Sequence, residues 1–152
     1  QRLAETNAGD PDLACLHELR ARIVTTLVAQ IRSAVRREVR VEVISTTQRP
    51  HAGTYLEGGD LAALAQACDG LELPLYQPTA DGLRRDAAYV WERVDPARTS
   101  AILRPGPPDM RDEAQLRQSV DFLRQAGVSG ISFYNLGLLR PHHLAWVQRA
   151  LA

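Results

Sequence analysis

From residue 38 onward, strand-like and helix-like segments alternate along this chain of 152 residues, and that alternation restricts the folds open to it. Short apolar or β-branched runs predict strands at 39–44, 71–76, 100–103 and 130–134, each followed by a helical pattern. The last two of these helical patterns span 113–126 and about 141–151. Strands joined in this way by helices form right-handed crossovers in a parallel sheet. The sequence therefore predicts an α/β fold of consecutive β-α units with parallel strands, most like the second half of a (β/α)8 barrel. A four-stranded doubly wound sheet is the alternative.

A long helix precedes the first predicted strand. An apolar residue recurs at spacings of three and four over 12–37, which predicts one buried stripe: Leu13, Leu16, Leu19, Ile23, Leu27 and Ile31. Residues 1–11 are mostly polar and form a loose leading segment. We therefore expect a single α/β domain or half barrel over 1–152, made of this segment, the helix and four β-α units over 38–152.

Composition excludes several classes of function. Eighteen basic residues balance eighteen acidic ones, and a nucleic-acid-binding protein would normally carry a basic excess. No apolar run approaches the roughly 18–20 residues that span a membrane. The chain contains no lysine, so it cannot form the Schiff bases of lysine-dependent aldolase or pyridoxal chemistry. We expect no nucleic-acid partner and no membrane partner.

The sequence also lacks the motifs of common cofactor sites. No Gly-x-Gly-x-x-Gly follows a predicted strand, and no Gly-Lys-Ser/Thr phosphate loop occurs, so no cofactor is predicted. The two cysteines, Cys15 and Cys68, form no C-x-x-C motif and are typical of buried thiols in a cytoplasmic protein. His142 and His143 are adjacent on a predicted helix and point about 100° apart, so no metal site is predicted and both are interpreted as capping or surface groups.

Polar and aromatic residues follow the predicted strands, where parallel α/β folds bind their ligands. In contrast, the strands themselves are mostly apolar. This asymmetry predicts a pocket at the carboxyl ends of the strands. The candidate substrate-binding residues are Gln48, Arg49, Tyr76, Arg104, Tyr134 and Asn135.

Two residues are candidates for catalysis. In 71–76 the three leucines share one face, so Glu72 and Tyr76 point the other way, into the lumen of a barrel. A carboxylate there needs a partner, and Arg104 on the neighbouring strand is the expected one. Glu72 is then either half of an internal ion pair or an acid/base group. His51, in a loop with glycine and proline, is either a general base or a surface residue.

Two segments carry a resemblance to a known group of proteins. Residues 59–76, from Gly59-Asp60-Leu61 to Leu73-Pro74-Leu75-Tyr76, and residues 126–135, ending Ile131-Ser132-Phe133-Tyr134-Asn135, resemble the late part of glycoside-hydrolase-like TIM barrels. The resemblance spans about 40–151 and implies a sugar-related pocket. Such barrels commonly carry an acid/base carboxylate on a middle strand, which would lie before Gln1. The resemblance therefore implies half a site, completed by a homo-oligomer or by a complementary N-terminal half.

Three functions follow. The first is a carbohydrate-active, glycoside-hydrolase-like barrel segment that hydrolyses its substrate by acid/base chemistry, with residues supplied from outside the chain. The second is a non-catalytic module that binds a small anion or sugar, with Arg49 and Arg104 suited to a phosphate or carboxylate. The third is a metal-assisted lyase or isomerase that uses His51 with Glu72. In each of these functions the partner is a small molecule, and in the first it is a sugar.

Overall fold

The computed structural model describes residues 10–47 and 58–152. It begins with a long helix, α2 (Pro11–Ala34), followed by four β-α units. The strands are β1 (Glu42–Ile44), β2 (Gly70–Pro74), β3 (Thr99–Leu103) and β4 (Gly130–Phe133). The helices after them are α3 (Leu61–Ala67), α4 (Ala80–Trp91), α5 (Glu113–Ala126) and α6 (Pro141–Leu151). Two short 3-10 turns, η2 (Pro96–Arg98) and η3 (Leu136–Leu138), precede β3 and follow β4.

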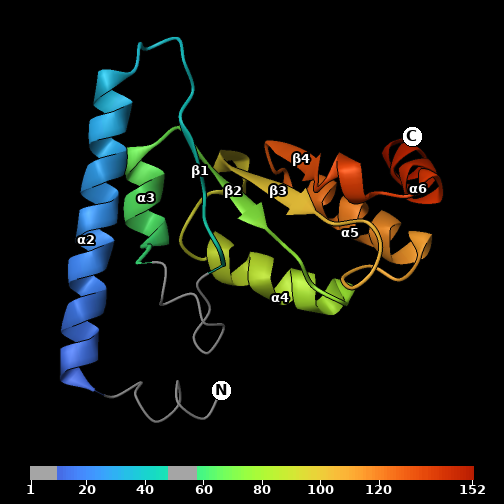
Figure 1. The fold of residues 1–152 in the computed structure, drawn as a ribbon, viewed down its shortest axis with the longest axis horizontal. Coiled ribbons are helices and arrows are strands. Elements are labelled where there is room, and N and C mark those ends of the chain that lie inside the picture. The colour runs from blue at the N-terminus through green and yellow to red at the C-terminus, as the bar shows by residue number, and fades with distance from the viewer. Residues whose placement is uncertain (1–9, 48–57) are drawn as a thin grey trace.

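The four strands form one parallel sheet in the order β1-β2-β3-β4. Val43 pairs with Leu71, Leu73 with Ala101, and Leu103 with Phe133, so each strand lies beside its neighbour in sequence. The predicted α/β fold of consecutive parallel β-α units is confirmed. In Figure 1, α2 and α3 lie at one end of the molecule, and α5 and α6 lie at the other.

The core lies between one face of the sheet and the helices. Alternation within β2 places Leu71 and Leu73, with Leu75 beyond its end, on the covered face, and all three are at most 1% exposed. They pack with apolar residues from three helices: Leu64, Leu83, Ala87, Val90, Leu116, Val120 and Leu123. The opposite face, which carries Glu72 and Pro74, is only partly buried.

The first helix differs from its prediction in a way that matters below. It ends at Ala34 rather than at residue 37, and its apolar stripe is not buried. Only Val28 of this helix is buried, whereas five apolar side chains of the stripe are 42–57% exposed: Leu16, Leu19, Ile23, Leu27 and Ile31. The period predicted the apolar face correctly, but within the described residues nothing covers it.

The two cysteines also differ from one another. Cys68 is buried, and its thiol donates to the carbonyl oxygens of Leu64 and Gly70, each 3.1 Å away. Cys15 lies exposed on α2, so the prediction of two buried thiols is wrong for this residue. The thiols are not joined. Within residues 10–47 and 58–152, no helix combines the length and the apolar character that crossing a membrane requires.

Candidate functional site at the carboxyl ends of the strands

The ends of β2, β3 and β4 bring three of the predicted binding residues together. Tyr76 and Tyr134 follow β2 and β4, and their ring centroids lie 6.0 Å apart at an angle of 38°. Arg104, directly after β3, places its guanidinium carbon 4.8 Å from the centre of the Tyr76 ring. This distance is typical of a cation–π contact, so Tyr76 contacts both the Tyr134 ring and the Arg104 guanidinium.

Burial and charge shape this cluster. Burial raises the pKa of the Tyr76 phenol, and the nearby Arg104 guanidinium opposes that rise. Tyr134 is 45% exposed, so its ring offers a surface to an incoming molecule. An exposed aromatic face can stack on the apolar face of a ring-shaped ligand. A guanidinium beside it can donate hydrogen bonds to the polar groups of the same ligand.

Arg104 takes Asp109 as its partner, not Glu72. Its Nε donates to Oδ2 of Asp109, and this hydrogen bond raises the pKa of the guanidinium further. Asp109 lies five residues later in the same loop and is only 7% exposed. The loop therefore folds back and places a buried carboxylate beside the arginine. The predicted Glu72–Arg104 ion pair is therefore wrong, because a carboxylate in the same loop supplies the counter-charge.

Glu72 instead bonds across the sheet. Its Oε1 accepts a hydrogen bond of 2.9 Å from the Ser132 hydroxyl on β4. The strand between them, β3, contributes Ser100 opposite Glu72. The bond therefore places Glu72 and Ser132 on the same face of the sheet, as alternation predicts. The carboxylate lies on the face that helices α3 to α6 leave open, below the aromatic pair.

The remaining predicted residues have different outcomes. Asn135 lies beside Tyr134, joined to it by a cis peptide bond, and is the residue before η3. Gln48, Arg49 and His51 lie outside the described residues, so their positions relative to this cluster stay a prediction. Among the residues that the structure does describe, no group of three His, Cys, Asp or Glu side chains is placed to hold a metal ion.

Two polar features near the site escaped the sequence analysis. Gln77, after Tyr76, donates from Nε2 to Oδ2 of Asp86 on α4 at 2.5 Å, and Asp86 is 2% exposed. Asp86 lies next to Ala87 and between Leu83 and Val90, which are also buried. An acidic residue among the buried positions of a helix is the signal that could have identified it.

The second missed feature is His143, which was predicted to be a capping or surface group. Its Nδ1 accepts a hydrogen bond of 3.4 Å from the Arg140 backbone N–H, so the capping role holds. However, the side chain is buried beneath Gly106, in the loop that joins Arg104 to Asp109. A Cβ on Gly106 would lie 2.6 Å from Cε1 of His143, so α6 supports this loop directly.

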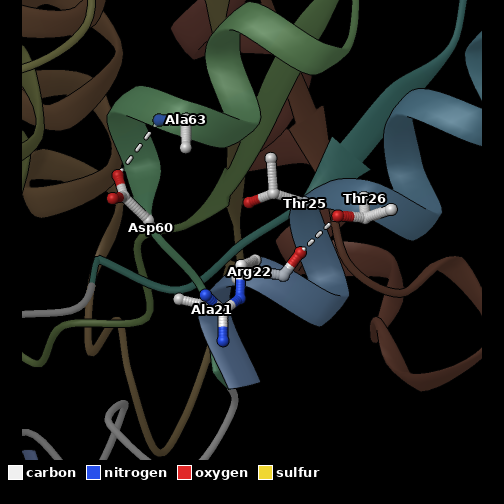
Figure 2. A pocket seen from close by; sticks show the side chains of 6 residues that line it. All are labelled: Ala21, Arg22, Thr25, Thr26, Asp60 and Ala63. Carbon is white, nitrogen blue, oxygen red and sulfur yellow. Dashed lines mark hydrogen bonds between the residues drawn. The ribbon is translucent and has the colours of Figure 1, made fainter. Parts of the chain in front are cut away.

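A hollow of about 310 Å³ lies elsewhere, between α2 and α3. Figure 2 shows its lining: Ala21, Arg22, Thr25, Thr26, Asp60 and Ala63. Two of its polar groups already serve the helices, because Asp60 accepts from the Ala63 N–H at 3.0 Å and Thr26 donates to the Arg22 carbonyl at 2.7 Å. The carboxyl-end cluster is therefore the better candidate site.

Comparison with known proteins relates the fold to chitinases. Neither a protein-family model nor a curated protein sequence matches the chain. Among solved structures, the C-terminal domain of a putative chitinase from Desulfitobacterium hafniense superposes with a TM-score of 0.72 at 10% identity, covering 86% of this chain and 60% of that one. A chitinase from Chromobacterium violaceum gives 0.71 at 15% identity, covering 89% and 63%.

The spore cortex-lytic enzyme of Bacillus cereus is a further structural neighbour, with a TM-score of 0.66 at 12% identity, covering 86% of this chain and 46% of that one. At these identities the likeness concerns the fold. The chain spans about three fifths of the length of the first two structures that it matches. Its fold is that of a TIM-barrel segment like those of the solved structures on which it superposes, as the sequence resemblance implied.

Proposed function

We propose that this chain is the carbohydrate-active segment of a glycoside-hydrolase-like barrel and binds a chitin-like sugar chain at the carboxyl ends of its strands. The observation that carries the proposal is the cluster of Tyr76, Tyr134 and Arg104, with Glu72 on the same face of the sheet. Names of the structural neighbours, two chitinases and a cortex-lytic enzyme, support the substrate class.

In this proposal the aromatic pair binds a sugar ring and Glu72 acts as the acid/base carboxylate. Glycosidic hydrolysis needs a proton donor at the leaving oxygen and a second group that activates water or stabilises the opposite face. Ser132 donates to Glu72 and would hold its orientation. His51 is proposed as a further acid/base residue, with Gln48, Arg49 and Asn135 at the rim of the site. The other half of the barrel would supply the remaining groups.

The chain would act as one unit over 1–152 that is completed by a homo-oligomer or by a complementary N-terminal half. The uncovered face of the sheet and the shorter span relative to the neighbours support this. We also propose a cytoplasmic location, which the two unpaired cysteines support.

The anion-binding module is the second candidate. An anion site needs a guanidinium with spare positive charge. Arg104 already has the Asp109 carboxylate as its partner, which disfavours a small anion at this position. The metal-assisted lyase or isomerase would need ligands from outside the described residues, beginning with His51.

Calorimetric titration with chitin oligosaccharides tests the proposal. We expect binding by the chain, and we expect Tyr76→Ala to weaken it at least about tenfold. Tyr89→Ala is the matched control, because Tyr89 lies on α4, outside the cluster, and its ring contacts the guanidinium of Arg93 beyond the end of that helix. Circular dichroism would verify that both variants fold. No binding by the folded chain at millimolar sugar would overturn the carbohydrate proposal, and inorganic phosphate binding in its place would favour the anion module.

A further inference from the structure

The large apolar side chains exposed on the described part of the molecule fall into two groups. The first, here called the N flank, precedes or belongs to β1: Leu16, Leu19, Ile23, Leu27, Ile31, Val39 and Ile44. The second, the C flank, follows β4: Tyr134, Leu136, Leu138 and Leu151. Residues 58–133, which contain β2, β3, β4 and three helices, contribute none. The two flanks lie at opposite ends of the molecule, as the positions of α2 and α6 in Figure 1 show.

The N flank is dominated by the stripe on α2. Ile23 and Leu27, one turn apart, are 57% and 54% exposed, and Ile44 at the end of β1 is 65% exposed. Contiguous apolar surface of this kind is rare on a monomer and marks an interaction site. The stripe has helical spacing, which is the pattern of a helix that packs against another element.

Each flank adjoins an open edge of the sheet. Among the described strands, β1 pairs with β2 alone and β4 pairs with β3 alone, so the outer edges of β1 and β4 have no strand beside them. Open edges present unpaired backbone groups that proteins normally cover. A partner that fits this surface must therefore offer parallel strand edges to β1 and β4 and cover both flanks at once.

The likeness of the fold to a TIM-barrel segment implies a sheet that curves towards its open face. Glu72 and Ser132 lie on strands that are not neighbours, yet their side chains are 2.9 Å apart on that face. A parallel sheet that curves in this way closes as a barrel, and about eight strands give an interior that side chains can fill. The described residues supply four strands.

We propose that two copies of this chain close on each other as one eight-stranded barrel. A two-fold axis parallel to the barrel axis sets β4 of each copy beside β1 of the other with the strands still parallel. The C flank of each copy then covers the N flank of its partner, so two equivalent contacts related by the axis cover all the open edges. The formal net charge of zero leaves no overall repulsion between copies.

This arrangement determines what the second copy contributes to the site. Since all eight strands point the same way, both sets of Tyr76, Arg104 and Tyr134 gather at one rim of the barrel. Glu72 of each copy faces the same lumen, so the closed barrel contains two such carboxylates. The inference rests on the proposed function in one respect, namely that the site is completed from outside the chain; it does not depend on the ligand being a sugar.

The mass of the purified chain in solution tests the proposal. Light scattering should give about 34 kDa, twice the 16.8 kDa of one chain. Ile23→Glu on the N flank and Leu138→Glu on the C flank should each raise the dissociation constant at least about tenfold. Ala88→Glu is the control, because Ala88 is exposed on α4 between the flanks, and it should leave the dimer unchanged.

Mixing the two flank variants distinguishes this barrel from other dimers. In the proposed arrangement, a mixed pair of Ile23→Glu and Leu138→Glu chains keeps one unaltered contact, so the mixture should dimerise more tightly than either variant alone. A dimer that Ile23→Glu disrupts and Leu138→Glu does not would indicate α2 packing on α2 and would overturn the closed barrel. A wild-type chain that stays monomeric at all concentrations would overturn it also, while a failure of sugar binding by an intact dimer would affect the proposed function alone.

Discussion

The Glu72 carboxylate and the Ser132 hydroxyl are 2.9 Å apart although the residues are separated by 60 positions in the chain and by a whole strand in the sheet. Adjacent strands lie about 4.8 Å apart, so side chains on alternate strands meet only where the sheet is concave or where one of them is long. The bond therefore fixes Glu72 and Ser132 on the same, open face of the sheet.

Replacement of Glu72 should separate catalysis from stability. In Glu72→Gln the side-chain oxygen still accepts from Ser132, so we expect the free energy of unfolding to change by less than about 1 kcal/mol. Hydrolysis of a chitin oligosaccharide by the complete assembly should fall by about 10²–10⁴-fold, because the acid/base group is lost. Reducing-sugar release and urea unfolding measure the two effects. Unaltered hydrolysis in the variant would exclude Glu72 as the acid/base residue.

Replacement of Asp109 should affect both the loop and the site. Asp109→Ala leaves Arg104 without its buried partner, and we expect a loss of about 1–3 kcal/mol in the free energy of unfolding. Arg104 would also be free to leave the Tyr76 ring, so sugar affinity should fall. The control is Asp121→Ala, an exposed carboxylate on α5. Equal unfolding midpoints in urea for the two variants would refute this role of Asp109.

Gly106 should tolerate no side chain. Its φ of +100° lies in the left-handed region, and a Cβ would come within 2.6 Å of the buried His143 ring. We expect Gly106→Ala to lower the free energy of unfolding by about 1–3 kcal/mol. Gly130→Ala is the matched control, because a Cβ there would meet only Ser100 at an ordinary 3.7 Å. Chemical unfolding curves that coincide for the two variants would contradict the close packing of His143 against this loop.

Asp69 should make the attachment of α2 sensitive to acid. The Val41 N–H, 2.8 Å away, and the Arg32 guanidinium hold the pKa of this carboxyl below its ordinary 3.8. A lowered pKa means that the folded protein releases this proton more readily than the unfolded chain. The contribution of Asp69 to stability is therefore complete above pH 3.8 and is lost as the pH falls through the lowered value.

Asp69→Asn tests this by the change of stability with pH. The gap between wild type and variant in the urea midpoint should be largest near pH 5 and should shrink towards about pH 2. Asp121→Asn should show no such trend. A gap that stays constant over this range would mean that the carboxylate charge is not what stabilises this contact.

His143 should weaken the docking of α6 at mildly acidic pH. Burial, with His142 and Arg140 nearby, lowers the pKa of this imidazole below 6.5. The unfolded chain therefore takes up a proton before the folded protein does, so stability is complete above 6.5 and decreases as the pH falls through the lowered value. In His143→Gln the decrease in the urea midpoint between about pH 7.5 and about pH 5.5 should be smaller than in the wild type, whereas His142→Gln should retain it. Identical slopes in all three proteins would count against a buried neutral His143.

Much of the architecture could be predicted because local patterns report it. The helices at 113–126 and 141–151 have their predicted bounds, since apolar spacing and a glycine or proline marked their ends. Alternation in the second strand placed its leucines in the core and Glu72 on the other face. The position of the candidate site followed from the rule that parallel α/β folds use the carboxyl ends of their strands.

Partners in space were not predictable in the same way. The α2 stripe was expected to be buried and is exposed, because a helical period shows which face is apolar but not whether another element covers it. Arg104 was expected to form an ion pair with Glu72 on a neighbouring strand, whereas the loop after Arg104 folds back and brings Asp109 into that ion pair. Asp86 and His143 were missed, because burial of a polar side chain depends on segments that are distant in sequence.

Sequence alone thus determined the order of the strands and helices, the faces that they present and the edge that carries the candidate site, since each depends on residues close together in the chain. Tertiary structure decided which groups meet there: Tyr76 with Tyr134, Arg104 with Asp109, and Glu72 with Ser132. It also revealed the two uncovered flanks. These depend on how the chain curves and returns on itself, and the free energy of such contacts arises from all the packed elements together.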